Sequence, residues 1–233
     1  MIYLLDYSIS KADVLAHLGY NNQEISDTLN QKIDACIALS YERIVPAFTY
    51  QIFSVHPSLH GIEIENTSLT IDSYDLKQLL CYSKEAILLA LTAGVGIEQA
   101  IRTQSYRDMT SCVILDSCAS VATENIAEAL QQQIKQTLSE KNLSITNRFS
   151  CGYGDFSLHY QKDLLQLLHA EKKIGLHANE FGILQPKKSI TAVIGIVDKQ
   201  IRHRYYAACS NCAAKEDCAY QKEGKTCFNY MQD

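Results

Sequence analysis

A long stretch of helical periodicity over residues 107–141 does most to limit the folds that this chain can adopt. Apolar side chains recur there every three to four positions, and most charged and amide side chains fall between them. The apolar positions are Val113, Leu115, Cys118, Val121, Ile126, Ala129, Leu130, Ile134 and Leu138. The pattern predicts one long helix that lies against the core of the protein.

Two further helices are expected before Pro46. Ser10 is a suitable N-cap for a short helix that ends near Gly19. Three-to-four spacing over residues 22–45 predicts a second helix, which Pro46 would terminate. We interpret the two helices as a pair packed on the core. A helix-turn-helix that binds DNA is the alternative, and the acidic balance of the chain disfavours it.

Residues 47–72 change to an alternating, β-rich pattern that predicts an antiparallel ribbon or meander. A short helix is expected over 75–80. The continuous apolar run 85–94, closed by glycine, favours a buried central strand, with a buried helix as the alternative. A brief helix over 97–103 would then lead into the long one.

The rest of the chain is expected to hold strands over 143–149, 174–184 and 189–197, and a helix over 160–172. Helices and strands are grouped along the chain and do not strictly alternate. This grouping predicts an α+β fold with a twisted, mainly antiparallel sheet and flanking helices.

Composition limits the class of protein. The chain has 233 residues, of which 47% are apolar, with only three prolines and no linker-like segment. We expect one continuous unit with a helical segment 1–46, a core 47–200 and a cysteine-rich tail 201–233. The net charge of −5 argues against binding of duplex nucleic acid. No window is long and apolar enough for a membrane span, and no signal peptide is evident, so we expect a cytoplasmic location with reduced cysteines.

A compact turn after the predicted strand 143–149 is the strongest candidate binding element. Arg148 supplies a permanent planar cation suited to a carboxylate. Gly152 and Gly154 let the backbone approach a ligand closely, and Tyr153 between them can stack or donate a hydrogen bond. A turn with a purely structural arginine would look the same, so these residues alone leave both interpretations open.

Two glutamates of the predicted long helix are a second candidate. Glu124 and Glu128 are four positions apart and therefore share a helix face. They are either two solvated side chains or a pair of which one faces a ligand amine.

The ordered combination of these residues resembles the C-terminal activation (reactivation) domain of cobalamin-dependent methionine synthase. The resemblance covers roughly residues 85–197 and is strongest over 148–195. The matching stretches are residues 122–130 (ATENIAEAL), Arg148 with Gly152-Tyr153, the helix end LLHAEKKIGL, residues 179–186 (NEFGILQP) and residues 188–192 (KSITA). The chain departs from that family after Gly152-Tyr153, where Gly154-Asp155-Phe156-Ser157 stands in place of Pro-Ala-Cys-Pro.

The resemblance implies an activation-domain-like fold and binding of S-adenosylmethionine. By that analogy Arg148 holds the methionine carboxylate, Glu128 contacts its amino group, and Tyr153 with the Gly152 and Gly154 backbone lies beside the ligand. The resemblance also implies a role in reductive reactivation of cobalamin carried by a partner, a methionine synthase or related corrinoid protein, with an electron-donor protein as a further partner. The chain would be at most a component of that methyltransferase activity, since no zinc-thiolate domain or cobalamin-binding histidine motif fits in it.

Two other functions stay open at this point. One is a metal-binding or regulatory interaction module whose ligand site has decayed. The other is an independent methyltransferase, which the absence of a Rossmann glycine signature disfavours.

The tail contains a separate candidate site. Cys209 and Cys212 form a Cys-x-x-Cys pair, and Cys218 and Cys227 follow. Four thiolates suit tetrahedral zinc or an iron–sulfur cluster. Free thiols and disulfides are the alternatives.

Overall fold

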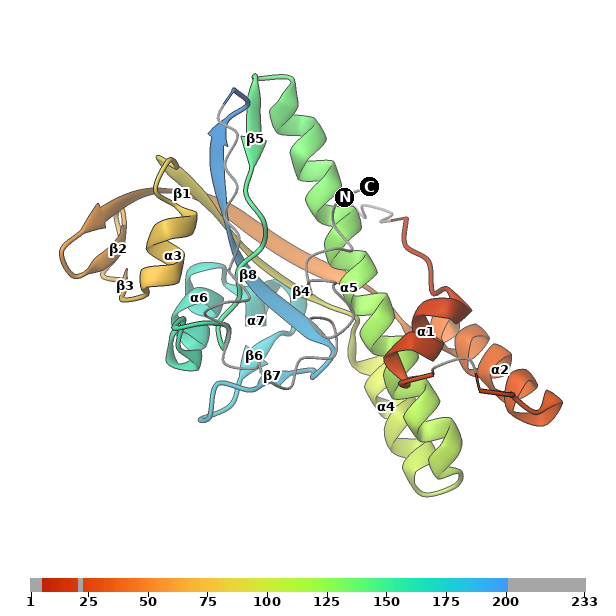
Figure 1. Cartoon of the computed structure of the whole chain (residues 1–233). Coiled ribbons are helices and arrows are strands. Elements are labelled where there is room, and N and C mark those ends of the chain that lie inside the picture. Colours follow the sequence, from red (N-terminus) through yellow and green to blue (C-terminus); the bar gives the residue numbers. More distant parts are fainter. Residues whose placement is uncertain (1–5, 21–22, 201–233) are drawn as a thin grey trace.

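A six-stranded antiparallel sheet runs through the centre of the molecule (Figure 1). The computed structural model describes residues 6–20 and 23–200 of the chain. In sheet order the strands are β3 (Thr70–Ile71), β2 (Gly61–Ile64), β1 (Ala47–Ser58), β4 (Glu85–Thr92), β8 (Ser189–Asp198) and β5 (Leu143–Ile145). A second, two-stranded sheet pairs β6 (His177–Ala178) with β7 (Leu184–Gln185). The predicted α+β fold with a mainly antiparallel sheet is confirmed.

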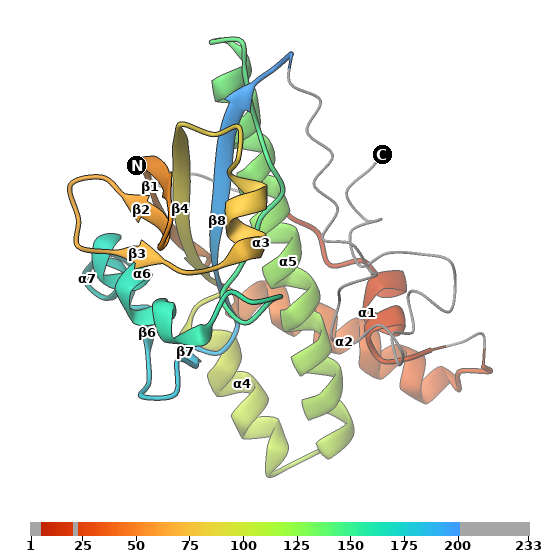
Figure 2. The same cartoon turned by 60° about the vertical axis from the view of Figure 1, so that its left-hand side comes forward.

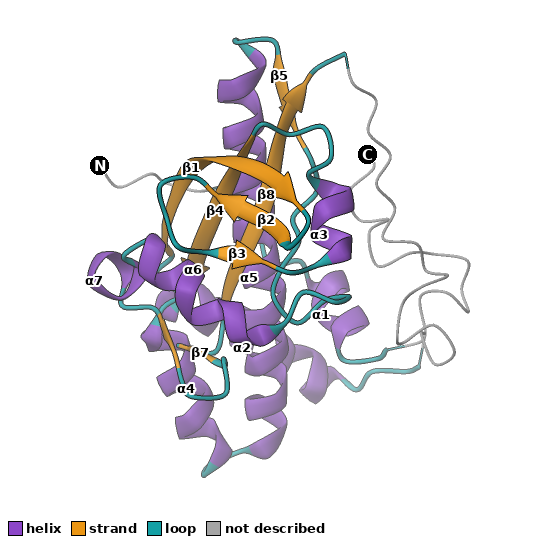
Figure 3. Ribbon diagram, turned by 90° about the vertical axis from the view of Figure 1, so that its left-hand side faces the viewer, coloured by secondary structure: helices purple, strands orange, loops and turns teal. Residues whose placement is uncertain are grey.

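The helices cover both faces of the sheet but differ in length. One face carries α1 (Lys11–His17), α2 (Asp27–Arg43), α4 (Val95–Ser105) and α5 (Met109–Ser139). The other face carries α3 (Tyr74–Leu79), the 3-10 turn η1 (Leu158–Tyr160), α6 (Gln161–Leu167) and α7 (Ala170–Ile174). Figure 3 looks onto the sheet from this second side, with α5 behind the strands. We call the two sides the α5 face and the α3/α6 face.

Strand β4 divides the apolar interior into two layers. Its residues alternate between the faces, as the two-residue period of a strand requires. Leu89 packs into the layer of the α5 face, and its neighbour Leu88 packs into the layer of the α3/α6 face. Both are at most 1% exposed. The run 85–94 therefore contains the buried central strand β4, which ends at Thr92, and the helical alternative is wrong.

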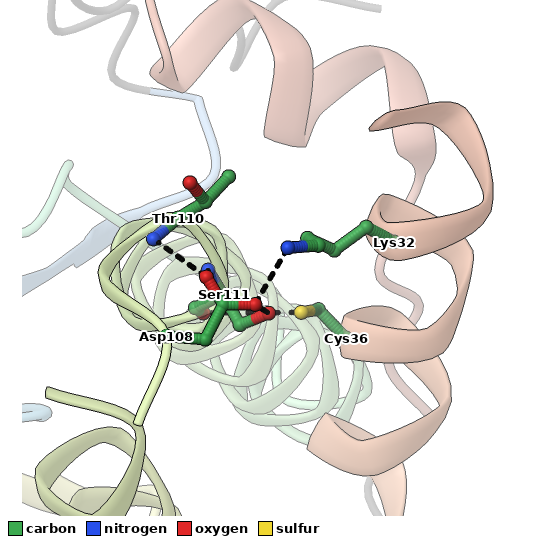
Figure 4. A network of polar contacts seen from close by, with 5 residues as sticks. All are labelled: Lys32, Cys36, Asp108, Thr110 and Ser111. Carbon is green, nitrogen blue, oxygen red and sulfur yellow. Dashed lines mark hydrogen bonds and ion pairs between the residues drawn. The ribbon is translucent and has the colours of Figure 1, made fainter. Parts of the chain in front are cut away.

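The long helix α5 starts at an aspartate that also anchors α2. The Asp108 carboxylate accepts hydrogen bonds from Thr110 N and Ser111 N, and it forms an ion pair of 2.6 Å with Lys32 of α2 (Figure 4). The hydrogen bond from Lys32, followed by that from Ser111, lowers the pKa of Asp108 to about 2. The prediction of one long helix is confirmed, although Val113 in its first turns is 50% exposed and does not join the core.

Four predicted elements differ from the structure. The strand expected over 143–149 is shortened to β5, and Phe149 beyond it forms only an isolated bridge with Val193. The second helix begins at Asp27, because Ser26 caps it by accepting from Leu29 N. The helix expected over 160–172 is broken at His169, whose φ of 51° is left-handed, and so forms α6 and α7. The strand expected over 174–184 is reduced to β6 and the first residue of β7. The Asn179 side chain accepts from the backbone N–H groups of residues 181 and 183 and folds the chain between them into a turn.

The N-terminal helices lie on the α5 face. Val14 of α1 and Ile33 of α2 are buried in the same apolar layer as Leu115 of α5. The division of the chain into segments 1–46, 47–200 and 201–233 stays a prediction. Among the described residues, no helix is both long and apolar enough to cross a membrane.

Candidate functional site

The chain after β5 continues beside β8, and its side chains point to both faces of the sheet. Phe149 exchanges two backbone hydrogen bonds with Val193 of β8, at 3.0 and 2.8 Å. Its ring enters the layer of the α3/α6 face. Because neighbouring side chains of an extended segment point to opposite faces, Arg148 points to α5. Figure 2 shows this part of the chain passing between α3 and α5.

Arg148 is held by three side chains of α5. Its Nη1 donates to Glu128 Oε2 and Gln131 Oε1, both at 3.2 Å. Its Nη2 donates to Glu124 Oε2 at 3.4 Å. The Arg148 side chain is 8% exposed, whereas those of Glu128 and Glu124 are 33% and 65% exposed. A largely buried cation is thus balanced by carboxylates that reach the surface.

The turn itself is closed by its own backbone. Gly152 N donates to Phe156 O at 2.7 Å, and Phe156 N donates to Tyr153 O at 3.0 Å. Phe156 is 1% exposed and stacks on Phe149, with ring centroids 6.0 Å apart. Gly152 and Gly154 have φ values of 93° and 54°, which glycine adopts without strain. The Tyr153 ring is 66% exposed at the tip of the turn.

A cysteine of this turn is not a reactive thiolate. Cys151 is buried, and burial raises the pKa of its thiol to about 12. A thiol with such a pKa stays protonated near neutral pH. The Cys151 thiol therefore offers no nucleophile near neutral pH, and the exposed groups of the turn are those of Tyr153 and the glycine backbone.

A second loop, residues 179–188, continues the polar surface along α5. Lys188 Nζ lies 2.8 Å from Asp116 Oδ1 and 2.9 Å from Ser120 Oγ. Asp116 and Ser120 precede Glu124 and Glu128 at successive intervals of four residues, so a polar side of α5 meets both Lys188 and Arg148. In the same loop, Phe181 and Ile183 are 71% and 50% exposed.

The structure brings together part of the predicted site and adds members to it. Arg148 and Glu128 are in direct contact, and Gly152, Tyr153 and Gly154 form the turn that follows. Gln131 and Lys188 were not predicted. The four-residue spacing of Asp116, Ser120, Glu124 and Glu128 is a signal that could have indicated the polar side of α5.

Two cavities lie away from these residues. One, of about 620 Å³, is lined by residues of α6, α7 and β6 that include Lys162, His169 and His177. The other, of about 350 Å³, lies beside β2 and β3. Neither is lined by Arg148 or by the turn 148–154.

The predicted metal ligands Cys209, Cys212, Cys218 and Cys227 lie outside the described residues. Within the described ranges, no group of three or more histidine, cysteine, aspartate or glutamate side chains could hold a metal ion. Binding of zinc or of an iron–sulfur cluster by the tail stays a prediction.

Comparisons with known proteins identify the fold. No protein-family model matches the sequence, and no curated protein matches it significantly. A solved structure described as "Crystal Structure of the MetH Reactivation Domain bound to AdoHcy" is similar, with a TM-score of 0.57 and 14% sequence identity. The similarity covers 86% of this chain and 72% of that chain. The chain therefore has the fold of the MetH reactivation domain, as its ordered motifs predicted.

Proposed function

We propose that this chain binds S-adenosylmethionine between α5 and the turn 148–154 and presents its methyl group to a corrinoid held by a partner protein. The partner would be a methionine synthase or a related corrinoid protein that needs reductive reactivation. One observation carries the proposal: a nearly buried Arg148 shared by Glu128 and Gln131, in a fold whose solved example is bound to AdoHcy.

The amino-acid end of the ligand matches the charges of this site. A guanidinium has five N–H donors in a planar fork, so Arg148 can hold a carboxylate while it keeps contacts to α5. Glu128 accepts from Arg148 and from Gln132 Nε2, but each carboxylate oxygen can accept more than one hydrogen bond, and its side chain is 33% exposed, so it can also contact the ammonium group. Tyr153 and the glycine backbone flank the same turn and would contact the rest of the ligand.

The total charge of the site favours the methyl donor over its product. Arg148, Glu124 and Glu128 together carry one negative charge at neutral pH. S-adenosylmethionine carries a carboxylate, an ammonium and a sulfonium, which sum to one positive charge. Loss of the methyl group leaves a neutral thioether, so the attraction weakens once transfer has occurred. The residues of this chain bind and orient the donor, while the partner supplies the corrinoid and an electron-donor protein supplies the electron.

Calorimetric titration with S-adenosylmethionine tests the binding step. Charge-assisted hydrogen bonds to Arg148 predict that Arg148→Ala weakens affinity by about 10- to 100-fold. Glu128→Gln should cause a smaller loss. The matched control is Arg102→Ala, which removes an exposed arginine of α4. The assignment fails if the parent does not bind, or if Arg148→Ala binds as tightly as the parent.

A reconstituted assay tests the second step. The chain, a reductant and S-adenosylmethionine are added to an inactivated corrinoid protein, and the absorbance of the methylated corrinoid is followed. The proposal predicts methylation that depends on all three additions. Binding of S-adenosylmethionine without methylation of any corrinoid protein would contradict the reactivation role alone.

A further inference from the structure

The carboxylate of Asp155, directly after the turn 148–154, is hydrogen-bonded to the start of helix α3. Asp155 Oδ1 accepts from Ser73 Oγ at 2.5 Å and from Asp75 N at 3.2 Å. Asp155 Oδ2 accepts from Tyr74 N at 2.6 Å. These donors form the N-terminal end of α3, which is some 80 residues earlier in the chain. Asp155 therefore caps a helix to which it does not belong.

Both carboxylate oxygens are needed in this arrangement. Burial alone would raise the pKa of Asp155, but the hydrogen bonds from Ser73, Tyr74 and Asp75 outweigh it and lower the pKa. An amide of the same shape would turn its NH₂ group toward a donor in either orientation. Asparagine at this position would therefore lose at least one hydrogen bond and place its NH₂ group against another donor.

Further hydrogen bonds hold the same segments together, among them that from Asp155 N to Asp75 Oδ2 at 3.4 Å. Asp72 N donates to the Tyr160 hydroxyl at 2.8 Å. Gly154 lies so close to the Asp75 carboxylate that a Cβ at Gly154 would collide with Oδ2. The segments 72–75 and 154–160 therefore form one connected contact, which we call the α3 clamp.

The turn depends on such a contact because of its glycines. Gly152 and Gly154 make its shape accessible, but glycine also gives the unconstrained chain many other conformations. Helix α3 already has its own cap, since Ser73 Oγ accepts from Leu76 N at 3.0 Å. The larger consequence of the Asp155 bonds therefore falls on the turn, where Tyr153 is only two residues away.

We propose that Asp155 is a positioning residue for the ligand site, which through the α3 clamp holds Tyr153 and the glycine backbone in the orientation that receives the ligand of Arg148. This inference rests on the proposed function. It assigns to Asp155 no contact with the ligand.

The test compares Asp155→Asn with the parent by titration with S-adenosylmethionine and by amide hydrogen exchange of residues 150–158 without ligand. We expect affinity to fall by about tenfold, as for loss of a hydrogen bond to a charged group, and exchange in the turn to become faster. The matched control is Asp34→Asn, which removes an exposed carboxylate of α2 that is paired with Lys11 of α1. It should change neither readout. If Asp155→Asn does not fold, Tyr160→Phe removes the hydroxyl that accepts from Asp72 N in the same clamp and should produce a smaller change in the same direction.

A fluorescent reporter separates positioning of the turn from simple support of α3. The chain contains no tryptophan, so Tyr153→Trp introduces a single tryptophan at the tip of the turn, whose emission can be excited separately from that of the tyrosines. Adding Asp155→Asn should lower its anisotropy, whereas weakening of α3 alone would leave it unchanged.

The outcomes distinguish the two proposals. If the parent binds and Asp155→Asn binds within about twofold with unchanged exchange of the turn, the role of Asp155 is refuted and the proposed function stands. If the parent does not bind, the proposed function fails, and the ligand role of Asp155 fails with it.

Discussion

The two faces of the sheet hold the halves of the candidate site by different means. On the α5 face, a helix of 31 residues places Glu124, Glu128 and Gln131 around Arg148. On the α3/α6 face, the elements are short, with six residues in α3, seven in α6 and five in α7. There the turn is fixed by one buried ring and one carboxylate. Rigidity comes from regular structure on the first face and from individual contacts on the second.

Two helix-capping aspartates illustrate this difference. Asp108 directly precedes α5 and caps its own helix. Asp155 caps α3 from a distant part of the chain. The first contact forms with the helix itself, whereas the second requires the sheet to have brought the two segments together. We therefore expect substitutions on the α3/α6 face to disturb the turn more than equivalent substitutions on the α5 face.

The largest expected effect is the loss of the ring that anchors the turn. Phe156 is 1% exposed and lies between Phe149 and Tyr160, with ring centroids 6.0 and 5.9 Å away. Phe156→Ala should lower the free energy of unfolding by about 3–5 kcal/mol, measured by urea denaturation. Phe181→Ala, at a ring that is 71% exposed, should cost less than about 0.5 kcal/mol. A loss below about 1 kcal/mol for Phe156→Ala would show that apolar packing does not anchor the turn.

Alanine substitutions at two glycines distinguish the free-energy cost of backbone strain from that of a steric collision. Gly175 has a φ of 67° and open space around it, so Gly175→Ala should cost about 1 kcal/mol for the left-handed conformation alone. Gly154 has a φ of 54°, and a Cβ there would displace Asp75 Oδ2, which accepts from Asp155 N, so Gly154→Ala should cost more, about 1–3 kcal/mol. The comparison is made by urea unfolding of the two variants. Equal losses would contradict a tight α3 clamp.

The helix cap on the α5 face should respond to pH in a defined direction. The pKa of Asp108 is lowered from 3.8 to about 2 in the folded chain, chiefly by Lys32. A lowered pKa stabilises the fold above pH 4, and this contribution is lost as the pH falls from about 4 toward 2. Asp108→Asn keeps a capping side chain but removes the charge. Its thermal midpoint should lie below that of the parent at pH 7 and approach it at pH 3. A constant difference between the two pH values would contradict the ion pair.

The smallest effect is expected at the outer partner of Arg148. The Glu124 side chain is 65% exposed, so Glu124→Gln should change the free energy of unfolding by less than about 0.5 kcal/mol. Glu128 is 33% exposed and shares the same guanidinium, so Glu128→Gln should cost more, up to about 1 kcal/mol. Urea denaturation of both variants measures the order. The reverse order would assign the main structural contact of Arg148 to Glu124.

Local patterns predicted most of the helices and strands. The periodicity of 107–141 located α5, the apolar run 85–94 located β4, and Ser10 located the start of α1. Each of these signals depends on residues within a few positions of one another. The errors arose where a tertiary contact or a single residue overrode the local pattern. His169 interrupts an otherwise helical stretch, and Asn179 replaces a predicted strand by a turn.

The same distinction applies to the site. Arg148, Glu128 and the glycine-flanked Tyr153 could be selected from the sequence, because their residue types and order carry the resemblance to a known domain. Tertiary structure alone decided that Gln131 and Glu124 share Arg148 and that Asp155 caps α3. Capping and ion pairing between distant segments depend on strand order and register, which residue order along the chain does not specify. The sequence thus determined which chemical groups are present, and the fold decided which of them meet.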